Sequence, residues 1–240
     1  MNMIIDKPWI SGPRELLIHG IQHLDFKSGF DYRIAMISID NSVELMIKTY
    51  LGLPKRITKI EGITKKKFED ITSTFPNLLD GLEEFSSDKL SGIDLGDIEW
   101  FHRLRNQLYH DGNGITVEKE KVETYAEIAK ILFGNLFGIE IEETGNETLH
   151  HSLVGEFIKE WANFEKQNLN VSGKPRVLID QLREMLKNGQ LSKKQAEKFN
   201  EIRKFKNNLV HGMSSPSQKE LKQYLIGLIE INKAINMGEA

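Results

Sequence analysis

The sequence contains no cysteine, and this absence excludes a disulfide framework, a cysteine nucleophile and a thiolate metal site. It also contains no long hydrophobic run. The most apolar stretch, residues 34–53, is interrupted by polar and charged side chains and falls short of the ~18–20 apolar residues that a membrane span needs. At the N-terminus no basic segment precedes an apolar core, so we expect no signal peptide. These absences predict a cytoplasmic protein with no membrane partner.

The sequence also lacks the motifs that bind common cofactors. It has no Walker phosphate loop, no dinucleotide-binding glycine fingerprint and no His-Glu-x-x-His zinc motif. Glu15, His19 and His23 recur every four residues, a geometry that could hold a metal ion. Because no further ligand accompanies them, a solvated helix face is the better interpretation. We therefore predict no metal site and no cofactor.

A strong overall charge is missing as well, since the formal net charge is −3. This argues against a protein that coats nucleic acid through bulk charge. The charge is nevertheless uneven: residues 1–149 carry 17 Lys and Arg against 25 Asp and Glu, whereas residues 150–240 carry 15 against 10. Either the two halves attract each other, or the basic half contacts a polyanion, and both interpretations stay open. The basic residues of segment 187–206 are equally consistent with RNA steering and with a solvated helix face.

Two-residue alternation is rare and valine is scarce, so the sequence predicts little β-sheet. Apolar residues recur at helical spacing instead. We expect the first helix to begin at Pro13, a residue favoured at the first helical position. The helices predicted after it span 30–51, 68–82 with a bend or break at Pro76, 97 to the glycine-rich turn at 111–114, 117–137, 153–165, 177–186, 193–210 after a Ser192–Gln195 capping box, and 216–235 after Ser215.

A polar, acidic segment divides these helices into two groups. Residues 140–152 (EIEETGNETLHHS) contain almost no large apolar side chain and are interpreted as a linker. The sequence therefore predicts an all-α fold of two helical bundles, residues 1–139 and 153–240, joined by this acidic linker.

The two predicted bundles share a short repeated segment. Residues 104–110 (LRNQLYH) align with residues 205–211 (FKNNLVH), and in each copy the histidine ends a predicted helix and glycine follows closely. We interpret this as duplication of one helical module.

The first copy resembles the signature of the HEPN superfamily, in which an arginine and a polar residue precede a histidine on one helix. Here Arg105, Asn106 and His110 occupy these positions. Upstream, Glu44 and Lys48 are similar to the Glu–Lys pair of an early family helix. The resemblance covers about residues 13–137.

Residues 153–236 resemble a shorter module of the same kind, whose second motif copy consists of Lys206, Asn207 and His211. This copy departs from the family pattern because Lys206 replaces the arginine, and lysine cannot offer a planar fork to a phosphate.

The resemblance implies a bundle of four or five helices that dimerises so that two motifs face each other across a cleft. Many family members are metal-independent endoribonucleases, often toxins or antiviral effectors. It therefore implies RNA as substrate, a homodimer, and an antitoxin or regulatory protein as a further partner. Other members are non-catalytic modules that bind RNA, a nucleotide or a partner protein, and this alternative stays open.

The residue types fit ribonuclease chemistry. A histidine such as His110 can take the proton of a ribose 2′-hydroxyl and return one to the leaving 5′-oxygen. Arg105 can bind the scissile phosphate, and Asn106, four residues before His110, can orient the imidazole or bind the sugar. Arg103 is a second candidate arginine because it is seven residues before His110 and nearly eclipsed with it. RNA would be cut to a 2′,3′-cyclic phosphate and a 5′-hydroxyl.

Two alternatives concern structure and assembly. Arg105 could instead serve only the fold, paired with Asp97, Glu99 or Glu44. For assembly, Lys206 could face Arg105 within one chain, or two chains could pair through their first bundles. We favour the homodimer, because it places two arginines in one symmetric cleft.

Overall fold

The computed structural model describes residues 7–110, 116–141, 153–168, 180, 183–189, 191–211 and 216–237. Within these ranges the chain is helical and contains no β-strand, which confirms the predicted all-α class. No helix in the described ranges is long and apolar enough to cross a membrane. The elements are α1 (Pro8–His23), the 3-10 helix η1 (Leu24–Phe26), α2 (Gly29–Gly52), α3 (Lys55–Thr58), α4 (Lys65–Ile71), α5 (Phe75–Ser86), η2 (Ser87–Leu90), α6 (Leu95–His110), α7 (Lys119–Phe137), α8 (Leu153–Asn168), α10 (Lys193–His211) and α11 (Gln218–Met237).

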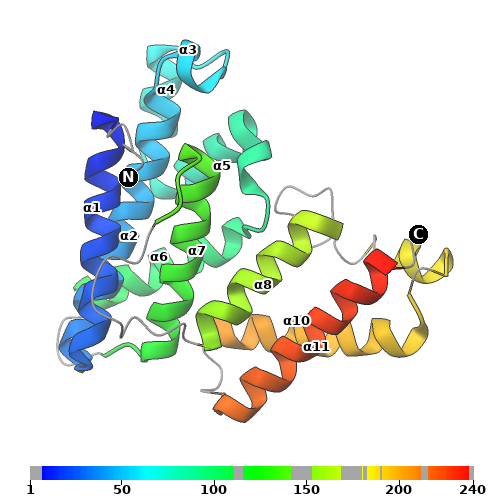
Figure 1. Ribbon diagram of the computed structural model, residues 1–240. Coiled ribbons are helices and arrows are strands. Elements are labelled where there is room, and N and C mark those ends of the chain that lie inside the picture. Colours follow the sequence, from blue (N-terminus) through cyan, green and yellow to red (C-terminus); the bar gives the residue numbers. More distant parts are fainter. Residues whose placement is uncertain are drawn as a thin grey trace, which may run out of the picture.

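Helix α2 is the centre of the N-terminal part, and α1, α5, α6 and α7 pack around it (Figure 1). Its buried side chains include Met36, Ile39 and Met46, which are fully inaccessible to solvent. Gly20 lets α1 approach closely, since a Cβ there would lie 2.8 Å from Ile39 Cγ1. Helix α6 packs against α2, on which α1 also packs closely.

The C-terminal helices α8, α10 and α11 lie together beside α6 and α7 (Figure 1). Their buried apolar residues belong to the same continuous cluster as those of the N-terminal helices. Gly92, at φ +74°, permits the approach of α8, because a Cβ there would lie 2.8 Å from that of Ala162. From residue 142 onward, the predicted linker 140–152 lies outside the described residues, and the two-bundle division stays a prediction.

Three predicted helix boundaries differ from the structure. The first helix begins at Pro8, so Pro13 lies inside it, where its missing N–H removes one hydrogen bond of the helix. The predicted helix 68–82 begins earlier, at Lys65, and its expected break falls just before Pro76: Thr74 caps α5 by accepting a hydrogen bond from Asn77 N, and Pro76 lies in the first turn of α5. The final helix begins at Gln218, with Ser217 accepting from Glu220 N.

The remaining expectations agree with the structure where it describes them. The Ser192–Gln195 capping box is confirmed by hydrogen bonds in both directions. Ser215, residues 111–115 and most of the predicted helix 177–186 lie outside the described residues, although 183–187 are helical.

Candidate functional site

Arg105 lies in the C-terminal half of α6 and is bound by side chains from α2 and from α6 itself. Its Nε donates a hydrogen bond to Asp40 Oδ2 at 2.6 Å, and one terminal nitrogen lies 3.5 Å from Glu44 Oε2 on α2. The other terminal nitrogen donates to Asn106 Oδ1 at 2.8 Å. The Arg105 side chain is 16% exposed. These contacts fix the guanidinium in one orientation at the edge of the bundle.

Asp40 organises this side of the bundle from a fully buried position. Its Oδ1 accepts a hydrogen bond from the Tyr125 hydroxyl at 2.8 Å, and its Oδ2 lies 3.0 Å from His102 Nδ1. Phe101 stacks on Tyr125, and Phe75 stacks on His102 at a centroid distance of 3.7 Å. Burial, with the nearby Asp40 charge, raises the pKa of Tyr125 well above its usual value. The phenol therefore keeps its proton and remains a hydrogen-bond donor.

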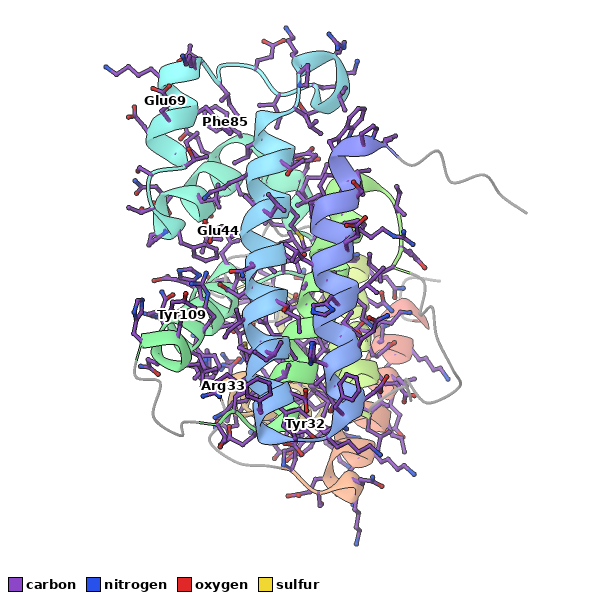
Figure 2. The ribbon with its side chains drawn as sticks, turned by 90° about the vertical axis from the view of Figure 1, so that its left-hand side faces the viewer. Tyr32, Arg33, Glu44, Glu69, Phe85 and Tyr109 are labelled. Carbon is purple, nitrogen blue, oxygen red and sulfur yellow. The ribbon has the colours of Figure 1, made fainter. Side chains whose placement is uncertain are left out.

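The predicted supporting pair, Glu44 and Lys48, forms an ion pair of 2.5 Å along α2. Since Glu44 also contacts Arg105, it links the two basic side chains. Figure 2 shows Glu44 on α2 and Tyr109 on α6 on the same side of the molecule. The structure therefore brings the sequence-predicted Glu44, Lys48, Arg105 and Asn106 together on one surface.

His110 is the last residue of α6, and its side chain is exposed. It lies beside the ring of Tyr109, which is 65% exposed, at a centroid distance of 5.4 Å. Within the described part of the chain, no hydrogen bond or ion pair reaches His110. On an ideal helix, five residues separate side chains by about 140°, so His110 and Arg105 point in different directions. Arg103, the other candidate, pairs with Glu99 at 3.7 Å on the exposed side of α6.

The second motif copy has a different environment. Lys206 is buried and forms an ion pair with Asp97, near the start of α6. His211 Nε2 lies 3.7 Å from the other Asp97 oxygen, while Asn207 is exposed. Asp97 precedes Arg105 by eight residues, about 12 Å along a helix. Lys206 therefore does not face Arg105, and the structure differs from the arrangement in which both motif copies form one site within a chain.

The histidines of α1 do not assemble a metal site. His23 Nδ1 lies 3.1 Å from Asp31 Oδ1, and its ring contacts that of His19. Hydrogen bonds from Ser28 and His23 lower the pKa of Asp31. Among the residues that the structure describes, no three or more His, Asp or Glu side chains are grouped in a way that could bind a metal ion.

A cavity of about 820 Å³ lies elsewhere, between the end of α1, α7, α8 and the start of α11. Its charged lining includes Lys119, paired with Glu123 at 2.7 Å, and Lys130, paired with Glu127 at 2.7 Å. The residues that line it include none of the predicted site residues. The candidate site is thus a surface, not this cavity.

Sequence reasoning missed three residues of the candidate site: Asp40, His102 and Tyr125. Asp40 is an acidic residue inside the most apolar stretch of the chain, and such a residue in a helix core needs a buried partner. His102 precedes Arg105 by three residues, which places both on one helix face. The phenol of Tyr125 carries no comparable signal in the sequence.

No protein family, curated protein sequence or solved structure matches this chain.

Proposed function

We propose that this protein is a metal-independent endoribonuclease of the HEPN kind, a cytoplasmic toxin or antiviral effector whose activity an antitoxin or other regulatory protein restrains. The observation that supports this proposal best is the anchored Arg105 on the same helix that ends at the exposed His110. A fixed guanidinium can stabilise charge on a phosphate without reorganising, and an exposed imidazole can move protons.

In the proposed reaction, the imidazole of His110 takes the proton of a ribose 2′-hydroxyl. The 2′-oxygen then bonds to the adjacent phosphorus, and the bond from phosphorus to the 5′-oxygen breaks. The imidazolium returns its proton to this leaving oxygen, so the products are a 2′,3′-cyclic phosphate and a 5′-hydroxyl. Arg105 stabilises the negative charge on the phosphoryl oxygens, and Asn106 keeps the guanidinium oriented.

The geometry favours action as a homodimer. The side chains of Arg105 and His110 point about 140° apart around α6. One phosphate group therefore does not easily contact both side chains of the same chain. A homodimer paired through α6 would bring two copies of Arg105 and of His110 to one symmetric cleft, so that the two groups acting on one phosphate can come from different subunits. In this arrangement the second motif copy supplies no catalytic group, because Lys206 is buried against Asp97.

A non-catalytic binding module is the second candidate, and one observation favours it. Every nitrogen of the Arg105 guanidinium already has a partner in Asp40, Glu44 or Asn106. If these contacts persist when RNA binds, Arg105 serves the fold and the surface can bind a partner without cutting it.

Incubation of mixed RNA with the purified protein in EDTA separates the two candidates. The two histidines of the repeat provide a matched pair of variants, His110→Ala and His211→Ala. A ribonuclease cleaves RNA in EDTA, loses activity in His110→Ala and keeps it in His211→Ala. Intact RNA after incubation with the folded dimer supports the binding module and refutes the ribonuclease proposal.

A further inference from the structure

A strongly basic segment follows α2 at one end of the molecule. Residues 55–67 contain six Lys and Arg residues and one acidic residue, whereas residues 1–149 as a whole carry 17 Lys and Arg against 25 Asp and Glu. The segment comprises α3, the connection 59–64 and the first turn of α4, at the top of Figure 1. We call residues 55–67 the basic lobe. Its charge is opposite to that of the half of the chain that carries it.

Packing fixes the basic lobe on the bundle. Phe68, the residue after the lobe, lies against the end of α2, since a Cβ at Gly52 would be 3.2 Å from its ring. Helix α4 packs on α5, and Thr64 caps α4 by accepting a hydrogen bond from Lys67 N at 3.2 Å. The ammonium group of Lys67 lies 5.5 Å from the ring centre of Phe85 on α5. The basic side chains therefore belong to a packed part of the fold.

Three of the six basic side chains pair with carboxylates. The pairs are Lys55–Glu61 at 2.5 Å, Lys65–Glu69 at 4.0 Å and Lys67–Glu84 at 3.0 Å. These pairs lie at the surface, where ion pairs are weak, so a phosphate can replace the carboxylate. In the described part of the chain, no carboxylate pairs with Arg56, Lys59 or Lys66. These three cations are available to an external anion.

Local stability does not explain the cations of the lobe. The three lysines 65–67 occupy the first turn of α4, where the helix dipole favours acidic side chains. Lys59 has a φ of +65°, a backbone conformation that glycine and asparagine adopt more readily than lysine. Residues that are unfavourable for their local structure are typical of functional sites.

The basic lobe lies on the side of the molecule that carries the candidate site. Glu44, which contacts Arg105, is eight residues before Gly52, the last residue of α2, or about 12 Å along the helix. Lys48, halfway between them, is partly exposed. Figure 2 shows Glu69 of α4 and Glu44 on the same side of the molecule. A strand bound at Arg105 can therefore continue along α2 to the lobe.

We propose that the basic lobe binds the phosphate backbone of an RNA strand that extends along α2 from Arg105. Lysine and arginine side chains bind phosphates without reading the bases, so the lobe adds affinity and not sequence specificity. The identity of the strand as RNA rests on the proposed function. A membrane surface fits less well, because membrane-binding helices carry a face of large apolar side chains. Of the described lobe residues, only Ile57 is a large hydrophobic residue that is exposed.

Fluorescence anisotropy with a single-stranded RNA methylated at every 2′-oxygen tests the proposal, because the proposed mechanism cannot cut this strand. Binding is measured between about 50 and 200 mM salt. For single strands, each phosphate contact contributes about 0.7 to the slope of log K against log salt concentration. The triple variant Arg56→Gln, Lys59→Gln, Lys66→Gln removes the three unpaired cations. Its slope should be shallower by about 2, and its Kd at the lowest salt concentration should rise by at least about tenfold.

A matched control removes the same charge from exposed lysines of α10, in the triple variant Lys193→Gln, Lys194→Gln, Lys204→Gln. It should keep the slope, and its Kd should stay within about twofold of that of the unsubstituted protein. Equal losses in the two triple variants would show a response to overall charge alone and would overturn the proposal. An unchanged slope in the lobe variant, or no binding of the strand by the unsubstituted protein, would overturn it as well.

Two further outcomes separate this proposal from its alternatives. Binding to vesicles that contain phosphatidylserine, but not to the RNA strand, would assign the lobe to a membrane surface and overturn the proposal. Binding that depends on the lobe, by a protein that leaves ordinary RNA intact, would support the lobe as a backbone-binding surface and refute the ribonuclease proposal alone.

Discussion

Replacing Asp40 by asparagine removes the charge that holds Arg105 while leaving the size of the side chain almost unchanged. Asp40 accepts hydrogen bonds from Arg105 at 2.6 Å and from Tyr125 at 2.8 Å, and it lies 3.0 Å from His102. An asparagine has one acceptor oxygen and one donor group at these positions. In Asp40→Asn, the amide NH₂ group of the asparagine therefore faces a donor group of one of these neighbouring side chains. The Arg105 guanidinium also loses its closest negative charge.

The expected loss of stability follows from burial. Removing one partner of a buried ion pair costs about 3–5 kcal/mol. Arg105 is 16% exposed and keeps Glu44 at 3.5 Å, so the loss should lie around the lower end of this range, at about 2–4 kcal/mol. At about 2–4 °C per kcal/mol for a chain of this size, Tm should fall by roughly 5–15 °C.

Calorimetric melting at pH 7 measures this change. The matched control is Glu99→Gln, which removes the exposed partner of Arg103 at 3.7 Å and should shift Tm by less than about 2 °C. The double variant Asp40→Asn, Arg105→Met should melt at a higher temperature than Asp40→Asn alone, because it no longer leaves a guanidinium unpaired. A single variant Asp40→Asn that melts within about 2 °C of the unsubstituted protein would refute this reasoning.

Three further predictions concern other parts of the molecule. His110→Ala should melt within about 1 °C of the unsubstituted protein because the side chain is exposed; a large loss would show a structural role. Gly92→Ala should destabilise more than Gly138→Ala in chemical denaturation: both glycines have positive φ, but only the Cβ at Gly92 meets another residue, Ala162, at 2.8 Å. Equal losses would argue against close packing there. Light scattering should give twice 27.6 kDa at concentrations where RNA is cut, and an active monomer would contradict the homodimer.

The long helices could be predicted from the sequence because their apolar spacing and end signals agree. The predicted 30–51 and 117–137 correspond to Gly29–Gly52 and Lys119–Phe137. The first residue of a helix was harder to predict where two nearby residues could each begin the helix. Pro8 and Pro13 both suit a first turn, and the structure begins α1 at Pro8. At the last helix, the Ser–Pro signal gave the wrong start, while Ser217 and Glu220 form the capping box that the structure uses.

Most of the candidate site that could be predicted from the sequence lies on α6, and on α2 the sequence indicated only Glu44 and Lys48. The motif placed Arg105, Asn106 and His110 near the end of α6, and the structure agrees. Of the acidic partners considered for Arg105, only Glu44 lies near it, since Asp97 pairs with Lys206 instead. Asp40 could not be found in this way, because its role depends on how α2 and α6 lie against each other.

The most direct test of the ribonuclease proposal compares an RNA oligonucleotide with the same strand methylated at every 2′-oxygen, in EDTA. The ribonuclease proposal predicts that the unsubstituted protein cleaves only the first strand, leaves 2′,3′-cyclic phosphate and 5′-hydroxyl ends, and loses this activity in His110→Ala. Cleavage of the methylated strand, or an unchanged rate in His110→Ala, would contradict it.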